Sequence, residues 1–381
     1  MAEQPPTVML AEPRAASVAN LEGELSALWR SASEEPSTRD ALTRSCALTL
    51  LVYVESEAEG REVNDLIGAV TAQNPCRVII LIGEPLGSPP GLSATVSAHC
   101  HLPEPGAKQV CCEQITLHAR GTSVENIDNV TLPLIVSGLP VHLWWRAGRF
   151  APPAHFDQIL RVADHVMLDS ARFPNPEADL RMLAARLETG VETLKITDLN
   201  WARITPWREL VAQCFDHPAR RPFLDRLTDV RMAYEAESPR VLTQRSQAML
   251  LTGWLASRLK WEFAERRVEG SAEFFVFRDG EREIRIEREA RQFDGAGCGV
   301  CFTLDLRADG AAPATFTFSR GPDGAVVQTR AEVPGSGPVG RTVRLEVMDE
   351  VAILNEELKV VGRDHVYEEA VRMAARMVAS A

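Results

Sequence analysis

The chain has 381 residues, of which 45% are hydrophobic and 25% are charged. This composition is ordinary for a globular protein, and the length is enough for two domains that each bury a core. The formal net charge of −12 argues against a nucleic-acid binder, because such proteins present a basic face to phosphate.

The amino-terminal sequence has no basic segment followed by an apolar core, so it does not resemble a secretory signal. No apolar run approaches the roughly 18 residues that are needed to cross a bilayer. We therefore expect a cytoplasmic protein that contacts neither membrane nor nucleic acid. The eight cysteines are scattered, which predicts mostly buried thiols in a reducing compartment and no disulfide scaffold.

The first part of the chain alternates between patterns of strand and helix. Residues 1–17 are rich in proline and predict a flexible tail. Residues 47–54 and 76–82 are apolar runs of strand length, and residues 57–73 between them carry apolar side chains at helical spacing. This order predicts a parallel sheet that is covered by helices.

Two later segments have the pattern of antiparallel or edge strands. Residues 92–102 and 109–117 alternate between apolar and polar side chains more than they run apolar. The sequence therefore predicts a mixed, largely parallel, Rossmann-like α/β domain over residues 18–172.

The second part of the chain, residues 173–381, has a different pattern. Helices are predicted over residues 205–216 and 242–260, and Asp364 is the predicted cap of a closing helix. Alternating segments separated by DG, GAG and PDG turns predict antiparallel hairpins at 274–277, 283–286, 300–306, 314–319, 325–330 and 342–347. We expect an α+β domain with an antiparallel meander.

Residues 132–148, LPLIVSGLPVHLWWRAG, place Trp144, Trp145 and Arg146 at the end of a predicted strand. Neighbours on a strand point to opposite faces, so one indole can fill the core while the other faces a helix layer, a cleft or a partner. The alternative is that both indoles are buried. Open α/β sheets bind ligands beyond the carboxyl ends of their strands, which is where Arg146 should lie.

This stretch resembles the signature of the glucose-6-phosphate dehydrogenase assembly protein family (OpcA). Four further segments resemble the family in the same order: NPCRVIIL, CCEQITL, DLNWARITPWREL and LLTGWLASRLKW. The resemblance implies a non-catalytic protein that binds glucose-6-phosphate dehydrogenase and assists its assembly or raises its activity. It implies no cofactor.

The segment DLNWARITPWREL supplies a second candidate surface. Tryptophan and arginine dominate interaction hot spots and anion clamps. The alternative is that the tryptophans are core and that the arginines pair internally. Arg146 could converge with this segment, so the predicted partner-binding residues are Trp144, Trp145, Arg146, Trp201, Arg203, Trp207 and Arg208.

Two other functions remain open at this point. The first is an enzyme or sensor that binds a sugar phosphate or a nucleotide in an α/β cleft beside Arg146. The second is a purely structural subunit of a larger assembly. Self-association is not predicted either way.

A search of the sequence for common catalytic and cofactor-binding motifs identifies no candidate active site. Residues 335–340, GSGPVG, fit the letters G-x-G-x-x-G, but Pro338 and the strand-like residues after it predict a loop. The sequence has no Walker loop, G-x-S-x-G elbow or H-E-x-x-H motif. His99 and His101 share a strand face without an evident third ligand, which predicts a solvated face and no metal site.

Cys298 and Cys301 form a C-x-x-C motif and are the candidate redox pair. The motif has no second pair at zinc-finger spacing. On a strand these two side chains would face opposite sides, so two independent thiols are the alternative.

Overall fold

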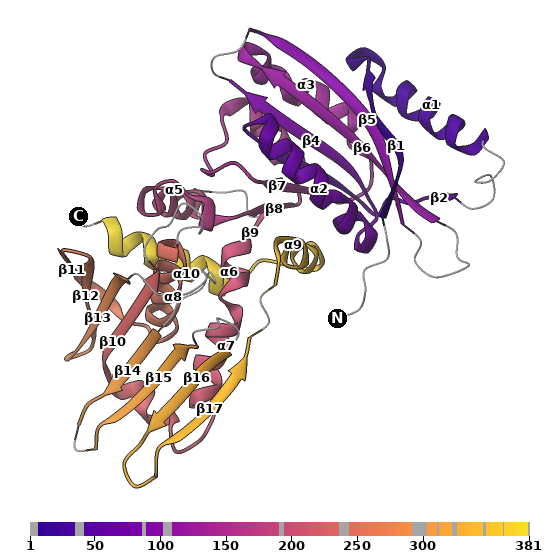
Figure 1. Cartoon of the computed structure of the whole chain (residues 1–381). Coiled ribbons are helices and arrows are strands. Elements are labelled where there is room, and N and C mark those ends of the chain that lie inside the picture. The colour runs from indigo at the N-terminus through magenta and orange to yellow at the C-terminus, as the bar shows by residue number, and fades with distance from the viewer. Residues whose placement is uncertain are drawn as a thin grey trace. The chain divides into compact units, whose positions relative to one another are not determined.

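The structure is a computed structural model that describes residues 7–34, 42–85, 89–101, 109–189, 194–235, 244–291, 303–310, 312–321, 326–345, 348–360 and 362–379. The chain forms two compact units, and each contains one large sheet (Figure 1). The first unit comprises Met1–Leu168, Val191–Thr197 and Asp349–Arg363, and the second comprises Asp169–Gly190, Asp198–Met348 and Asp364–Ala381. The chain therefore returns to the first unit twice after leaving it. Among the described residues, no helix has the length and apolarity to cross a membrane.

The sheet of the first unit is mixed and mainly parallel, as predicted. Its strands lie in the order β1 (Thr7–Ala16), β5 (Gly91–His101), β6 (Gln109–Arg120), β4 (Cys76–Glu84), β3 (Leu48–Val54), β7 (Val141–Trp145), β8 (His165–Leu168) and β9 (Lys195–Asp198), with β2 (Leu42–Arg44) beside β6. The pairs β1–β5 and β5–β6 are antiparallel, whereas β6, β4, β3, β7 and β8 run parallel to one another. This confirms the α/β, Rossmann-like class.

Helices and short 3-10 turns complete the first unit. They are α1 (Leu21–Glu34), α2 (Glu57–Gln73), α3 (Ile127–Thr131), α4 (Asp157–Val162) and α9 (Glu350–Lys359), with 3-10 turns at Val18–Asn20, Gly121–Asn126, Leu132–Leu134 and Ala154–Phe156. Helix α2 begins where the Ser56 side chain accepts a hydrogen bond from the Glu59 amide at 3.2 Å, and it buries Val63, Ile67 and Val70.

The amino-terminal strand β1 replaces part of the predicted flexible tail. It pairs with β5 at the edge of the sheet, and its register shifts between Ala11 and Arg14, where Pro13 lies. Proline has no amide hydrogen to donate, and an edge strand tolerates that loss. The proline content of residues 1–17 predicted a tail, but residues 7–16 form the edge strand of the sheet.

The histidines of β5 are more buried than predicted, and a cysteine of β5 is bonded to a cysteine of β6. His99 and His101 are 5% and 6% exposed, so the expected solvated face is wrong. Cys100 and Cys111 lie opposite each other on the antiparallel pair and form a disulfide. The expectation of buried thiols is right for Cys76, Cys112 and Cys214 and wrong for this pair.

The sheet of the second unit is mainly antiparallel, also as predicted. Its strands lie in the order β11 (Glu262–Glu269), β12 (Ala272–Asp279), β13 (Arg282–Arg291), β10 (Leu227–Glu235), β14 (Thr303–Ala308), β15 (Ala314–Arg320), β16 (Val326–Glu332) and β17 (Val339–Arg344). Strand β10 was not predicted, and it runs parallel to β13 in the middle of the sheet. The helical elements are α5 (Pro176–Thr189), α6 (Leu199–Arg203), α7 (Thr205–Phe215), α8 (Gln244–Arg258) and α10 (His365–Ala379), with 3-10 turns at Ser170–Arg172 and Arg221–Arg226.

The residues 335–340 that fit G-x-G-x-x-G lie between β16 and β17 and at the start of β17. Gly335 has a φ of +78°, a conformation that glycine adopts freely. A hairpin connection of this kind presents no helix N-terminus to a pyrophosphate, so the prediction of a loop is confirmed.

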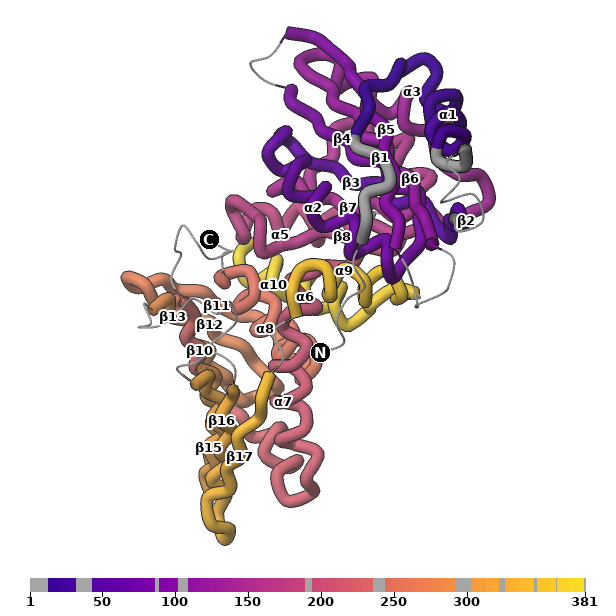
Figure 2. The backbone as a smooth tube through the Cα atoms, turned by 45° about the vertical axis from the view of Figure 1, so that its right-hand side comes forward, coloured from indigo at the N-terminus to yellow at the C-terminus, as the bar shows by residue number. Residues whose placement is uncertain are grey.

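Helices α8 and α10 pack side by side and very closely (Figures 1 and 2). A Cβ atom added to Gly253 of α8 would lie 2.3 Å from the carbonyl oxygen of Ala370. That oxygen belongs to the backbone of α10 and cannot move away without shifting the helix. Gly253 is therefore required for the approach of the two helices.

We expect Gly253→Ala to destabilise the protein by about 1–3 kcal/mol or more, because the new methyl group overlaps the α10 backbone. Helix propensity alone predicts the opposite sign, since alanine favours a helix interior by about 1 kcal/mol over glycine. Chemical denaturation would measure the difference. Gly337→Ala is the control, because its Cβ would meet nothing within 4 Å, and a Gly253→Ala variant as stable as this control would contradict the packing argument.

Candidate functional site

The two tryptophans at the end of β7 are buried in the first unit. Trp144 is 0% exposed and Trp145 is 2% exposed. The Trp145 ring packs against Tyr53 at a centroid distance of 4.5 Å and against Phe156 at 5.2 Å, and its indole N–H donates to the Arg149 carbonyl at 2.8 Å. Both indoles are therefore buried in the core, which is the second of the two possibilities raised by the sequence.

Arg146 follows β7 and is only 3% exposed. Its guanidinium donates to the Glu62 carboxylate of α2 at 3.0 Å and to both oxygens of Glu350 of α9 at 3.1 and 3.2 Å. Burial lowers the pKa of Arg146, but the two carboxylates raise it above its ordinary value. The guanidinium therefore stays charged and ties two helices to the end of β7.

The segment DLNWARITPWREL is held in a similar way in the second unit. Trp201 is buried, and its indole N–H donates to Asp364 at 2.8 Å. The Arg208 guanidinium stacks over the Trp201 ring at 3.5 Å, which is a cation–π contact. Arg203 forms a bidentate pair with Asp169 at 2.6 and 2.9 Å, and Trp207 is 0% exposed.

Asp198, at the start of the same segment, is a notable residue that the sequence did not single out. It is 1% exposed, and it caps α6 by accepting a hydrogen bond from the Asn200 amide at 2.9 Å. The Ser170 amide also donates to it at 2.9 Å, and the Tyr367 hydroxyl does so at 3.3 Å. Burial and the nearby Asp169 charge raise the pKa of Asp198 to about 7, against hydrogen bonds that lower it.

Of the seven predicted partner-binding residues, five are buried, and Arg203 and Arg208 are partly exposed. Arg146 belongs to the first unit and the DLNWARITPWREL residues to the second, so their convergence stays a prediction. Direct contact of these seven residues with a partner also stays a prediction. Cys298 and Cys301 lie outside the described residues.

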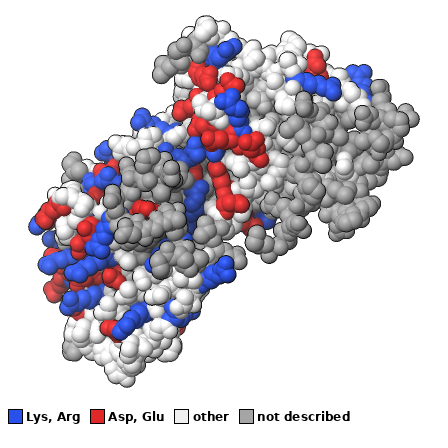
Figure 3. Space-filling model, viewed as in Figure 1, with Lys and Arg blue, Asp and Glu red and all other residues white. Residues whose placement is uncertain are grey.

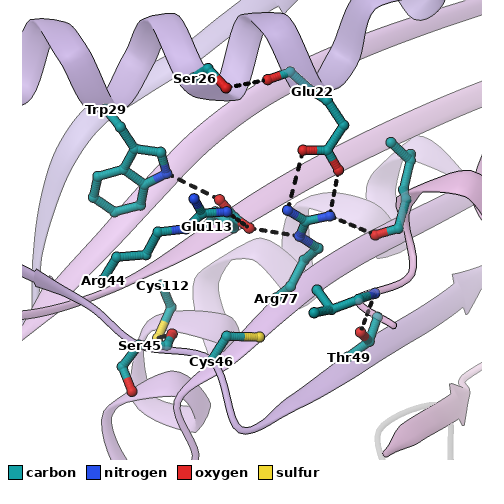
Figure 4. Close-up of polar contacts among 12 residues, drawn as sticks. Glu22, Ser26, Trp29, Arg44, Ser45, Cys46, Thr49, Arg77, Cys112 and Glu113 are labelled. Carbon is teal, nitrogen blue, oxygen red and sulfur yellow. Dashed lines mark hydrogen bonds and ion pairs between the residues drawn. The ribbon is translucent and has the colours of Figure 1, made fainter. Parts of the chain in front are cut away.

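A buried ion-pair network joins two other family-like segments, NPCRVIIL and CCEQITL (Figure 4). Arg77 of β4 donates from Nε to the Glu113 carboxylate of β6 at 2.6 Å, and from Nη1 to Glu22 of α1 at 2.6 Å. Arg44 and the Trp29 indole also donate to Glu113, at 2.8 and 3.0 Å. Burial raises the pKa of Glu113, but the Arg77 charge and these hydrogen bonds bring it below its ordinary value.

The second unit contains a matching network on its sheet. Arg288 of β13 is 0% exposed and donates to Glu273 of β12 at 2.8 Å. Arg266 of β11 donates to the same carboxylate at 2.6 Å and also bonds to Glu177 of α5. Burial raises the pKa of Glu273, but the Arg288 charge and the other arginines lower it to about 2.

One face of strands β10, β11, β12 and β13 in the second unit carries many exposed charged side chains. Its charged side chains surround a hollow of about 690 Å³, whose lining includes the partly exposed Phe274 and Val276. Asp229 and Arg231 of β10 lie opposite the oppositely charged Arg285 and Glu287 of β13, and Phe274 and Val276 of β12 separate β13 from Glu265 and Arg267 of β11. Figure 3 shows acidic and basic side chains interspersed over this part of the unit. We call it the charged sheet face, and it comprises Asp229, Arg231, Glu265, Arg267, Phe274, Val276, Arg285 and Glu287.

No group of three or more His, Cys, Asp or Glu side chains within the described part of the chain is arranged to hold a metal ion. His99, one of the two histidines considered as ligands, bonds to Gln114 at 2.9 Å. Burial lowers the pKa of both His99 and His101.

The fold and these networks define a two-unit α/β protein with a Rossmann-like sheet and a second, mainly antiparallel sheet. Comparison with known families gives a more particular result. The model for the glucose-6-phosphate dehydrogenase subunit N-terminal domain matches residues 68–185, and the model for the corresponding C-terminal domain matches residues 194–371. Both models carry the name OpcA, and the chain belongs to this glucose-6-phosphate dehydrogenase assembly family.

Two relatives carry the provisional name OxPP cycle protein OpcA. The protein from Nostoc punctiforme is 29% identical over 319 residues, which cover 81% of this chain and 66% of the relative. The protein from Synechocystis is 34% identical over 228 residues, which cover 60% of this chain and 45% of the relative. The matched part of this chain thus spans from less than half to about two thirds of these relatives.

Solved structures show only weak similarity to this chain. A dehydrogenase, MviM, from Clostridium difficile is 7% identical with a TM-score of 0.43, and the match covers 87% of this chain and 98% of that chain. The myo-inositol dehydrogenase of Lactobacillus casei is 10% identical with a TM-score of 0.41, and the match covers 88% of this chain and 93% of that chain. We draw nothing on function from likenesses of this size.

The raised pKa of Asp198 predicts how stability depends on pH. A folded-state pKa of about 7, above the ordinary 3.8, means that the folded protein binds the proton more tightly than the unfolded chain. The contribution of Asp198 is therefore fully present below about pH 4 and is lost as the pH rises through 7. Asp198→Asn mimics the protonated acid, so its stability relative to the wild type should increase by roughly 2–4 kcal/mol between pH 4 and pH 8.

Urea denaturation of both proteins at several pH values tests this, because all other titrating groups are shared and cancel in the difference. If the unfolding free energies of the wild type and of Asp198→Asn change with pH in the same way from pH 4 to pH 8, Asp198 does not hold a proton in the folded state.

Proposed function

We propose that this protein is a non-catalytic partner of glucose-6-phosphate dehydrogenase that binds the enzyme and favours its active oligomer. The observation that carries the proposal is the ordered match to both domains of a family described as a glucose-6-phosphate dehydrogenase subunit. The names of the relatives place them in the OxPP cycle, which supports a role in the oxidative pentose phosphate pathway. A cytoplasmic location is part of the proposal.

The mechanism that we propose is linkage. If the protein binds the active form of the dehydrogenase more tightly than the inactive form, the equilibrium shifts by the difference in binding free energy. The enzyme's substrate and this protein should then strengthen each other's binding by the same factor. Such a protein needs a stable surface and supplies no reacting group of its own.

We propose the charged sheet face as the surface that contacts the dehydrogenase. Phe274 and Val276 give its hollow an apolar part, and charges of both signs surround them. An apolar centre within a polar rim is the usual anatomy of a protein interface. Mixed charges also select a partner of complementary pattern.

The seven tryptophan and arginine residues then act on the partner indirectly. Because five of them are buried and the arginines bond to carboxylates or stack on a ring, we propose that they fix the backbone of their own units. The alternative of a metabolite site beside Arg146 is not proposed, since Glu62 and Glu350 already bind that guanidinium.

Steady-state kinetics of the organism's own dehydrogenase, with and without a saturating amount of this protein, tests the function. We expect kcat/KM for glucose 6-phosphate to increase about fivefold or more when this protein is present. We also expect the two proteins to associate more tightly when the substrate is present. Unchanged kinetics together with unchanged association would contradict the proposal.

A substitution tests the surface separately. Phe274→Asp should raise the concentration of this protein needed for half-maximal activation by about tenfold or more, because it places a charge in the apolar hollow. Val339→Asp is the matched control, since Val339 is 52% exposed on β17, outside the charged sheet face. Equal activation by the two variants would place the contact elsewhere.

A further inference from the structure

A cleft in the second unit gathers cations beside the carboxyl end of α8. It has a volume of about 430 Å³, and its lining includes Arg258 at the end of α8, Lys260 and Trp261 just after it, and Glu369, Arg372 and Arg376 from α10. Four cationic side chains thus lie around a small space in a chain whose net charge is −12. Pockets of this size accommodate small ligands.

The backbone at Lys260 is the first unusual feature of this cleft. Lys260 has a φ of +57°, and no other non-glycine residue among those described has a positive φ. The amide of Lys260 bonds to the Ser257 carbonyl and the amide of Trp261 to the Ala256 carbonyl, which is the Schellman arrangement at the end of a helix. Glycine is the residue that this left-handed position favours, because it has no Cβ to clash.

A lysine is therefore present where the local backbone prefers glycine. Favourable interaction with the helix dipole explains a cation near the end of α8, and Arg258 already provides one there. That effect does not require a side chain at the left-handed residue itself. Strain held at a defined position is a reason to look for a function of the side chain.

The indole of Trp261 supplies a second, independent observation. Trp261 is 1% exposed and lines the cleft, yet its buried N–H has no hydrogen-bond partner in the described structure. A buried donor without an acceptor is costly, so such a group calls for an explanation. An anionic oxygen in the cleft would supply the missing acceptor.

Two of the four cations form ion pairs with acidic residues. The other two form no ion pair with any residue that the structure describes. Arg258 pairs with Glu369, and Arg372 pairs with Glu368 at 3.1 Å. No ion pair within the described part of the chain involves Lys260 or Arg376. The cleft therefore has spare positive charge, and a residue of its lining, Trp261, has an N–H donor without an acceptor.

We propose that this cleft is a binding site for the phosphate group of a small phosphorylated metabolite. Lys260 and Arg376 neutralise the phosphate, Arg258 and Arg372 strengthen the field, and the Trp261 N–H donates to a phosphate oxygen. Several cationic donors around one phosphate are the usual means of holding such a group. The proposal does not depend on any role with a dehydrogenase.

Calorimetric titration of the full chain with inorganic phosphate, at constant ionic strength maintained with chloride, tests the site. We expect saturable binding of one phosphate, with a dissociation constant that rises at least tenfold in Lys260→Gly and in Arg376→Ala. A phosphate monoester should bind and its unphosphorylated counterpart should not. Arg61→Ala, which removes an exposed cation in the first unit, should bind phosphate like the wild type.

Lys260→Gly separates binding from folding, because glycine suits the left-handed backbone at that position. We expect this variant to unfold at the same temperature as the wild type or higher while it loses phosphate binding. Absence of phosphate binding by the wild-type chain, or unchanged binding by Lys260→Gly, would overturn the proposal. A lower unfolding temperature for Lys260→Gly would contradict the argument that the lysine is retained against the preference of the backbone.

Discussion

A guanidinium group that is removed from water must be paired, and this constraint organises both units. A buried charge without a partner costs several kcal/mol, whereas a buried pair with good geometry is tolerated. Arg77 meets the requirement through Glu113, Arg146 through Glu350, and Arg288 through Glu273. The first two pairs join elements that are separated in the sequence, and the third joins the consecutive strands β12 and β13, so the register of each sheet and the position of α9 depend on these pairs.

This constraint explains why the family-like segments lie mainly inside the molecule. Arg77 and Glu113 come from two of these segments and bond to each other, and Arg146 comes from a third. Residue types that dominate binding hot spots are also those that can satisfy a buried carboxylate or stack on a ring. Most of these segments thus stabilise the scaffold, and the charged sheet face is formed by residues outside all five of them.

Much of the fold was predictable from periodicity, because a buried parallel strand and an alternating antiparallel strand have different patterns. Residues 47–54 and 76–82 have the first pattern, and residues 92–102 and 109–117 have the second. Strand β10 was missed because its pairing with β13 is parallel and depends on contacts across about fifty residues.

The candidate site was less predictable than the fold. The sequence drew attention to tryptophan and arginine but could not show that Arg146 would meet Glu62 and Glu350. Burial of Asp198 and the left-handed conformation of Lys260 depend on tertiary structure and backbone geometry, which periodicity does not encode. Their only local signals were a polar residue before a short helix and a lysine where a helix ends.

A double-mutant cycle of Arg77 and Glu113 is the most direct measurement of the constraint on which this account depends. The unfolding free energies of the wild type, Arg77→Met, Glu113→Leu and the double variant give the coupling between the two side chains. We predict a favourable coupling of about 1–3 kcal/mol, with the double variant more stable than the sum of the single losses implies. Strictly additive losses would contradict the claim that the buried pair determines how β4 and β6 are held together.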